Sequence, residues 1–183
     1  MNGWVIVAVA VVAVILVFGL YLSMTAGRLD HLHRRIDTSI LALDAQLLRR
    51  SSVAIELASS QVLDPASGTL VADAAHRART AADLGHEERA LAESDLTAAL
   101  LATLDPEDLA EVRLQPMGGD MLDELAAASR RVQLTRRFHN DAVRACRQVR
   151  RQRMVRLFRL AGHTPWPETW EMDDSMPEGL GGR

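Results

Sequence analysis

The chain has no lysine, and its only cysteine is Cys146. All 21 basic residues are therefore arginine, which we attribute to composition bias rather than to a structural need. A lone thiol excludes an internal disulfide, so the sequence gives no sign of an oxidising compartment. Aromatic residues make up only 4% of the sequence, and β-branched residues are concentrated in its first turns. The abundant Ala, Leu, Arg and Glu favour helices, because these side chains lose little rotamer freedom there.

Motifs of known chemistry are also missing. The sequence has no nucleotide-binding loop, paired-cysteine motif, HExxH segment or nucleophile elbow. His31 and His33 are two residues apart and would project from different sides of a helix. His76 and His86 have no third ligand at a useful spacing, and His139 fits a packing position. We therefore expect a protein that is not an enzyme and that binds no metal or cofactor.

A long apolar run opens the chain. Residues 5–22 are eighteen consecutive residues without a charge or an amide. As a helix they span ~27 Å, close to the ~30 Å hydrocarbon core of a bilayer. Trp4 and Tyr21 sit at the two ends of the run, where amphipathic rings favour the headgroup level. A cleaved signal peptide is the alternative, but the run is too long and no basic residue precedes it.

The arginines that flank this run predict its direction. None precedes it, whereas Arg28, Arg34 and Arg35 follow it closely. The positive-inside rule therefore places the N-terminus outside and the main domain in the cytoplasm. We expect a single-pass protein of the plasma membrane, in contact with the bilayer through residues 5–22.

Helix breakers divide the remaining chain. Turn residues cluster at 64–68 and 115–119, and a third cluster begins at Gly162. The long segments between them are 28–61, 69–104 and 120–160. Asp105 and Pro106 predict a short extra helix over 107–113, with Asp105 as its N-cap. Gly85 predicts a kink within the second long segment, and Asp120 is the expected N-cap of the third.

Apolar residues recur at helical spacing in each long segment. The expected core positions are Leu29, Leu32, Ile36, Ile40, Leu43, Leu47, Ala54 and Leu57; Ala74, Ala78, Ala81, Leu84, Leu91, Leu96 and Leu100 or Leu101; and Leu125, Val132, Phe138, Ala142, Cys146 and Val149. We predict an all-α fold, in which an N-terminal transmembrane helix precedes an antiparallel bundle of three long helices. The expected domains are an anchor over 1–27, a helical bundle over 28–160 and a mobile C-terminal tail over 161–183. In this bundle the third helix leads away from the membrane.

Several segments resemble the LemA family of membrane-anchored helical proteins. They read MNGWVI (1–6), RID (35–37), LDAQLLRR (43–50), AESDLTAAL (92–100) and RRFHNDAV (136–143). The sequence departs from the family pattern where His139 replaces a usual Tyr and where Cys146 and Arg147 replace a common Tyr-Asn pair. The resemblance implies a helical bundle of the coiled-coil kind on a single-pass anchor. It implies no settled biochemical activity.

The last long segment is rich in arginine. Eleven arginines lie between residues 130 and 159, where Asp141 is the only acid. Arg130, Arg137, Arg144 and Arg151 repeat every seven residues and predict a stripe along the helix. The candidate interaction surface is Arg137, Arg144, Arg147, Arg151 and Arg156.

Three interpretations of this stripe compete. The arginines could pair with acids of the first helix, such as Asp37 and Asp44. They could bind a cytoplasmic protein or an anionic polymer through their guanidinium groups. Anionic lipid is the third interpretation, and the expected direction of the helix opposes it, since residues 144–159 would lie beyond a Debye length of ~8 Å from the membrane.

We expect a membrane-tethered scaffold of the LemA type with a cytoplasmic protein partner, and the sequence leaves homo-oligomers open. The alternative is a membrane-anchored binder of an anionic polymer or nucleic acid. We expect nucleic acid less, because no reading motif or interleaved aromatic residue accompanies the arginines.

Overall fold

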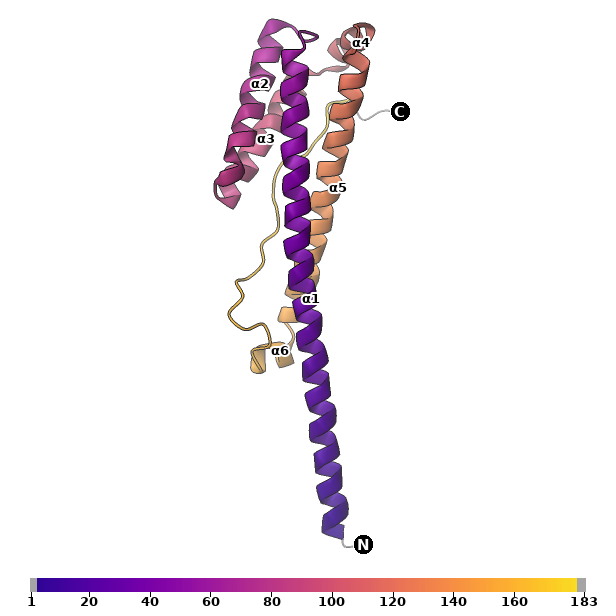
Figure 1. Cartoon of the computed structure of the whole chain (residues 1–183), viewed down its shortest axis with the longest axis vertical. Helices are drawn as coiled ribbons and strands as arrows, with labels where there is room; N and C mark the ends of the chain where they lie inside the picture. Colours follow the sequence, from indigo (N-terminus) through magenta and orange to yellow (C-terminus); the bar gives the residue numbers. More distant parts are fainter. Residues whose placement is uncertain (1–2, 181–183) are drawn as a thin grey trace. The chain divides into compact units, whose positions relative to one another are not determined.

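The computed structural model describes residues 3–180, and all regular secondary structure in that range is helical (Figure 1). The helices are α1 (Gly3–Ser59), α2 (Pro65–Thr80), the short 3-10 helix η1 (Ala81–Asp83), α3 (His86–Thr103), α4 (Pro106–Leu114), α5 (Gly118–Arg150) and α6 (Arg153–Leu157). The prediction of an all-α protein is confirmed. The predicted set of three long helices is wrong in its middle member, as described below.

The chain forms two compact units. The first, which we name the anchor unit, comprises residues 1–38 and 141–168; the second, the core unit, comprises residues 39–140 and 169–183. Helices α1 and α5 each contribute one part to both units. The division cuts across the domains expected from the sequence, because it pairs segments that are distant along the chain.

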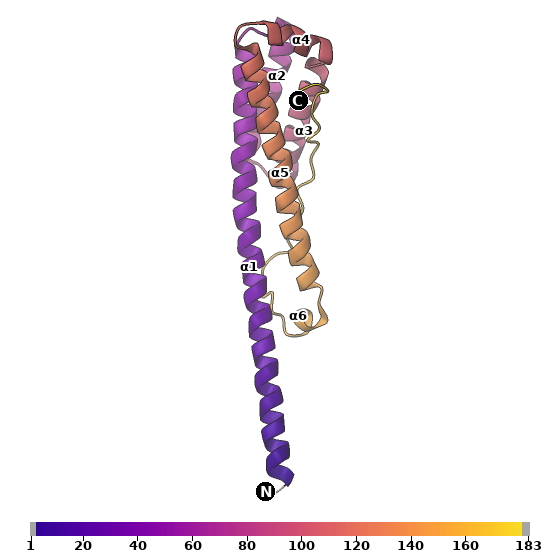
Figure 2. The same ribbon diagram turned by 90° about the vertical axis from the view of Figure 1, so that its right-hand side faces the viewer.

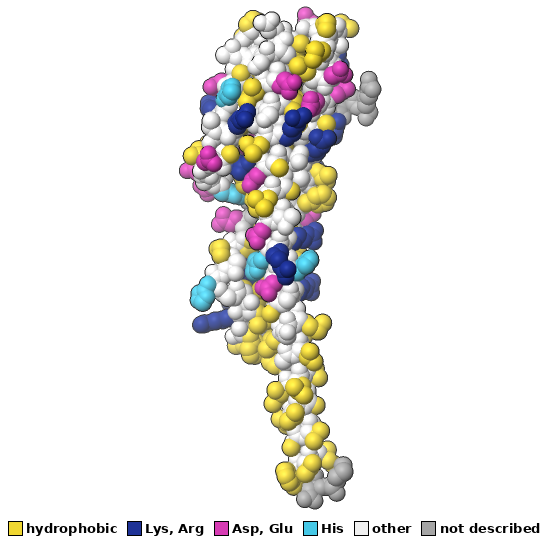
Figure 3. Space-filling model, in the orientation of Figure 1, with side chains coloured by type: hydrophobic (Ala, Val, Ile, Leu, Met, Phe, Trp, Pro, Cys, Tyr) yellow, Lys and Arg dark blue, Asp and Glu magenta, His cyan; other side chains and the backbone are white. Residues whose placement is uncertain are grey.

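Helix α1 contains the apolar run and continues beyond it without a break. It covers 57 residues and is long and apolar enough to cross a membrane. Its interior glycines are Gly19 and Gly27, and neither interrupts the helix; a Cβ at either position would meet nothing within 4 Å. The side chains of the apolar run are exposed, and hydrophobic atoms gather there on the visible face (Figure 3).

The core of the core unit is built on the expected stripe of α1. Leu43, Leu47 and Leu57 are fully buried there, which confirms these predicted positions. One cluster joins Leu57 to residues of α2, α3, α4 and α5, and a second joins Leu43 and Leu47 to Val132 and Trp170. The stripe is buried because positions spaced by three and four residues face one side of a helix.

The middle segment forms two helices where the sequence predicted one. Helix α2 ends at Thr80, and Gly85 adopts an extended conformation before α3 begins. The two helices pack against each other, so Gly85 belongs to a chain reversal and is not a kink (Figure 1). Leu84 and Leu91, which were expected in the core, are exposed because the reversal interrupts the stripe.

Helix α4 confirms the short helix expected after Pro106. The side chain of Asp105 accepts hydrogen bonds from the amides of Glu107 and Asp108, as an N-cap does. Helix α5 starts earlier than predicted, at Gly118, so Asp120 lies in its first turn and is not its N-cap. A Cβ at Gly118 would lie 2.0 Å from the carbonyl oxygen of Val112, which explains why only glycine fits there.

Helix α5 runs antiparallel to α1 in both units. In the core unit Ser39 contacts His139 at 3.0 Å, while the later residue Arg49 pairs with the earlier residue Glu124. In the anchor unit Leu29 and Cys146 belong to one apolar cluster. Figure 2 shows α5 beside α1 from a second direction. The predicted direction of the last helix was wrong because the α2–α3 reversal adds one pass of the chain before α5.

Residues 161–180 form no helix or strand, as expected, but residues 170–176 are not a free tail. Trp170 is buried, and its backbone exchanges two hydrogen bonds with the side chain of Asn140, at 2.7 and 3.1 Å. Arg136 donates two hydrogen bonds to the carboxylate of Asp174, at 2.7 and 2.9 Å. The prediction of a mobile tail therefore fails for these residues, since side chains of α5 hold them in place.

Candidate arginine surface and buried polar network

Arginines at the C-terminal end of α5 and directly after it line a shallow hollow in the anchor unit. Arg144, Arg147, Gln148 and Arg151 surround a space of about 360 Å³. Arg144, Arg147 and Gln148 lie in the last two turns of α5, and Arg151 directly follows the helix, three residues after Gln148 and four after Arg147. Three guanidinium groups in one hollow suit an anionic ligand, because each presents several fixed donors.

The structure brings together only part of the predicted surface. Arg144, Arg147 and Arg151 lie together in the anchor unit, and so does Arg156, which belongs to α6 and does not line the hollow. Arg137 belongs to the core unit and is exposed there. Arg147 also stabilises the fold, because its Nε donates a 2.8 Å hydrogen bond to the carbonyl of Pro167.

The acids expected to pair with the stripe have other environments. The carboxylate of Asp44 lies 2.9 Å from a guanidinium nitrogen of Arg89, on α3. Arg144 pairs with Asp141, three residues earlier on the same helix, and both side chains are more than half exposed. The interpretation that the stripe pairs with acids of the first helix is not supported at Asp44 or at Arg144, because Asp44 pairs with Arg89 and Arg144 pairs with Asp141. Asp37 is exposed.

The expected membrane-interface residues lie on the outside of α1. Trp4 is 71% exposed and Tyr21 is 48% exposed. Arg28, Arg34 and Arg35 are exposed as well. Their positions leave all five side chains accessible to a lipid headgroup region.

Sequence reasoning missed the role of Arg150. Its guanidinium donates hydrogen bonds to the carbonyls of Thr164 and Pro165, at 2.8 and 2.5 Å. It also lies 5.0 Å from the ring centroid of Trp166, in cation–π range. Arg147 and Arg150 together fold residues 164–167 back onto the end of α5. The one signal in the sequence was Trp166 between two prolines, a large aromatic residue in a segment that cannot be helical.

A second missed feature is a buried charged pair in the core unit. Arg50 is 2% exposed and Glu93 is 1% exposed, and their side chains meet at 2.7 Å. Arg50 also donates to the Glu93 carbonyl at 2.9 Å and to Thr97 Oγ1 at 3.1 Å. Burial raises the pKa of Glu93, against the opposing charges of Arg50 and Arg89. Both side chains are almost completely buried and bind each other directly, so we interpret the pair as structural.

The network extends to the C-terminal segment. Thr97 donates a 2.8 Å hydrogen bond to the carbonyl of Asp173, whose amide donates to Ser94 Oγ at 3.0 Å. The guanidinium of Arg89 lies 5.6 Å from the ring centroid of Trp170. Residues 170–174 thus cover the side of α3 that carries the buried pair.

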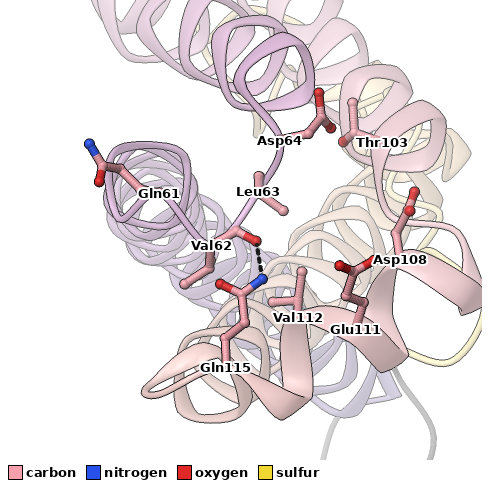
Figure 4. Close-up of a pocket in the computed structure, with 9 residues that line it drawn as sticks. All are labelled: Gln61, Val62, Leu63, Asp64, Thr103, Asp108, Glu111, Val112 and Gln115. Carbon is pink, nitrogen blue, oxygen red and sulfur yellow. Dashed lines mark hydrogen bonds between the residues drawn. The ribbon is translucent and has the colours of Figure 1, made fainter.

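A separate hollow of about 250 Å³ lies beside the connection between α1 and α2 (Figure 4). Gln115 donates a 3.1 Å hydrogen bond to the carbonyl of Val62 at its edge. Asp64 also lines it but is already used as the N-cap of α2; hydrogen bonds from Ser67 lower its pKa. Within residues 3–180 no group of three His, Cys, Asp or Glu side chains is placed to hold a metal ion.

The cysteine and the histidine beside the arginines are buried. Cys146 packs against Leu29 and Leu32, and burial raises the pKa of its thiol. His139 is 3% exposed and contacts Ser39 Oγ. Both match the packing positions that the sequence predicted, and Phe138, which was expected beside them in the core, is 52% exposed.

No protein-family model matches the chain, and no curated protein and no solved structure matches it either. The resemblance to the LemA family stays a prediction from the sequence motifs.

Proposed function

We propose that this chain is a single-pass membrane protein whose helical part serves as a scaffold for a protein partner in the cytoplasm, in the manner of the LemA family. One observation carries the proposal. Helix α1 passes without interruption from the exposed apolar run into the buried stripe of the core unit. A helix that is exposed and wholly apolar over eighteen residues needs an apolar surrounding, and a bilayer supplies it.

The charge of the anchor unit supports the proposed orientation. Its residues include ten arginines and four acids, a net charge of +6 by sequence. None of these arginines precedes the apolar run. Positive charge that follows a membrane span is retained on the cytoplasmic side, so the N-terminus faces outward from the plasma membrane.

The outward face of α5 in the core unit offers a surface for a protein partner. Leu134 and Phe138 lie one turn apart and are 50% and 52% exposed. Arg130, Arg131 and Arg137 surround them at helical spacing and are exposed. Apolar anchors with arginines at the rim are the composition of protein interfaces, and the partner is expected to carry acids around an apolar groove.

Thiol labelling tests the topology. Cysteine is introduced singly at Asn2 and at Ser60, and intact cells are treated with a membrane-impermeant maleimide. We expect label at position 2 and none at position 60 until the cells are opened. Label at position 60 in intact cells contradicts the orientation, and extraction of the protein from membranes by alkaline carbonate contradicts the anchor.

Site-specific cross-linking tests the partner surface. A photoreactive amino acid replaces Phe138 in one variant and Leu91, an exposed leucine of α3, in a control variant. We expect a discrete cross-linked protein from position 138 that Arg137→Glu removes, and no such product from position 91. Equal products at both positions, or a product that survives Arg137→Glu, would contradict this surface.

The hollow lined by Arg144, Arg147 and Arg151 favours a second candidate function, the binding of an anionic polymer or nucleic acid. Counterion release makes such binding weaken steeply as salt rises. Binding of a labelled oligonucleotide that falls steeply with salt and is lost in Arg144→Glu/Arg151→Glu supports this second candidate. Absence of binding at low salt rejects it.

A further inference from the structure

Helix α6 returns the chain to the apolar run of α1. The ring of Phe158, which follows α6, meets the ring of Phe18 edge to face, with centroids 5.4 Å apart. Both residues belong to the anchor unit. Phe18 precedes the end of the apolar run at Leu22 by four residues, or ~6 Å along a helix. An inserted span therefore places Phe158 just below the level at which the run ends.

The segment around α6 carries exposed apolar side chains. Leu157 is 73% exposed, Phe158 is 43% exposed and Trp166 is 45% exposed. We name residues 151–166 the α6 elbow. Its exposed apolar surface differs from that of a loose loop, because Val155 is buried with Leu29 and Leu32.

Hydrogen bonds close the elbow from its other side. Arg150 binds the carbonyls of Thr164 and Pro165, and Arg147 binds that of Pro167. The elbow thus has a fixed place against α1 and α5 within the anchor unit. Its exposed leucine and phenylalanine are held in position and remain uncovered by the described chain.

The elbow is also basic. Arg151, Arg153, Arg156 and Arg159 are exposed, and no acid occurs between residues 142 and 167. No ion pair involves these four arginines within residues 3–180. The four guanidinium groups have no acidic partner in that range and lie next to the exposed apolar side chains of the elbow, near the end of the apolar run of α1.

We propose that the α6 elbow lies on the anionic leaflet of the bilayer that holds α1, with Leu157 and Phe158 in the acyl boundary and the four arginines on lipid phosphates. The inference rests on the proposed membrane span of residues 5–22. Basic amphipathic segments bury their apolar face ~5–10 Å below the headgroups, which agrees with the level of Phe158. Each arginine near an anionic surface strengthens such binding by roughly fivefold.

The sequence disfavoured lipid binding, because the predicted bundle placed the arginines of the last helix far from the membrane. The antiparallel direction of α5 removes that objection. The expected helix carried its arginines away from the membrane, whereas residues 144–159 belong to the same unit as the apolar run. An aqueous polymer such as nucleic acid is a poorer match, because Phe158 contacts a residue of the proposed span.

Depth measurement by spin labelling tests the proposal on the full-length protein. Single cysteines replace Leu157, Val12 in the apolar run, and Leu114, which is 88% exposed in the core unit and serves as control. Each nitroxide-labelled protein is placed in nanodiscs of phosphatidylcholine alone or mixed equally with phosphatidylglycerol. Oxygen and a water-soluble nickel chelate report whether each label lies in lipid or in water. The buried Cys146 stays unlabelled under native conditions.

We expect the label at 157 to be protected from nickel and accessible to oxygen in the anionic discs, while the label at 114 remains in water. Arg153→Gln/Arg156→Gln should weaken this binding by ~25-fold, since two arginines are lost at roughly fivefold each. The matched control Arg77→Gln/Arg79→Gln removes the same charge from the core unit and should leave the depth at 157 unchanged.

The outcomes separate the elbow from the anchor. A label at Val12 in lipid with a label at 157 in water in both kinds of disc overturns the elbow and leaves the proposed span intact. A label at Val12 in water overturns the span itself. Equal loss of depth from both arginine pairs overturns the role of the elbow arginines.

Discussion

The two units share the helices α1 and α5, yet they differ in charge and in how they are stabilised. The core unit carries a net charge of −9 by sequence and buries two apolar clusters around a charged pair. The anchor unit carries +6 and buries one small cluster of Leu29, Leu32, Cys146, Val149 and Val155. The nearly neutral balance of the whole chain hides this separation.

The difference shows which interactions each unit depends on. The core unit is stabilised by buried side chains that contact one another within the protein. The anchor unit leaves its apolar run and most of its arginines without partners in the described chain. In the proposed membrane-bound state, this unit would gain stability from the bilayer, by the transfer of apolar area and by attraction to anionic lipid.

The largest expected effect comes from breaking the buried pair of the core unit. Glu93→Gln leaves the charge of Arg50 buried without compensation, and we expect the free energy of unfolding to fall by ~3–5 kcal/mol. Chemical denaturation in detergent, followed by circular dichroism, measures it. The double variant Arg50→Met/Glu93→Leu should recover most of the loss, because no charge then remains buried. A loss below ~1 kcal/mol for Glu93→Gln would show that the pair is open to water.

Apolar burial in the core unit gives the next effect. Leu47 is fully buried, so Leu47→Ala should lower the free energy of unfolding by ~2–5 kcal/mol. Leu41 lies on the same helix and is 68% exposed, and Leu41→Ala should change it by less than ~0.5 kcal/mol. The same denaturation curves serve for both variants. Similar losses at the two positions would mean that α1 presents a different face to the core.

The smallest effect is expected in the anchor unit. The Arg144–Asp141 pair is exposed, so Arg144→Gln should alter the free energy of unfolding by no more than ~1 kcal/mol. The matched variant Arg130→Gln removes an exposed arginine of the core unit and should behave alike. A large loss for Arg144→Gln alone would make the arginine surface part of the fold and would remove the contrast between the units.

Local signals in the sequence predicted much of this fold. The apolar run, the stripe of α1 and the cap of α4 depend on residues within a few turns of one another. Asp105 and Pro106, for instance, specify the start of α4 without help from the rest of the chain. Periodicity along one helix likewise placed Leu43 and Leu47 in the core.

The sequence predicted a kink at Gly85 instead of the reversal between α2 and α3, because a single glycine within a helical pattern is compatible with either. The neighbouring charges held the missing signal. Arg77 and Arg79 lie in the last turn of α2, and Glu87 and Glu88 lie in the first turn of α3. The helix dipole favours basic residues at the C-terminal end of one helix and acidic residues at the N-terminal end of the next, so this order of charges indicates two helices. Missing this reversal also gave the wrong direction for α5 and so the wrong place for its arginines.

Contacts between distant segments were beyond local patterns. The burial of Trp170 depends on Asn140, thirty residues earlier, and the burial of Arg50 depends on Glu93. No local sequence pattern around Trp170 or Arg50 indicates which distant residue it contacts. The candidate surface was therefore predicted in part, with Arg144, Arg147 and Arg151 together, but without Arg150 and the α6 elbow that it holds.

Disulfide trapping tests most directly whether the segment after α5 returns to the apolar run and forms the anchor unit with it. Cysteines replace Phe18 and Phe158 in the full-length protein, and mild oxidation is carried out in native membranes. We expect an intramolecular disulfide, seen as a shift of the monomer on a non-reducing gel. Cysteines at Ser39 and His139, which contact each other in the core unit, give the positive control. A disulfide in the control pair but none between positions 18 and 158 would contradict the account.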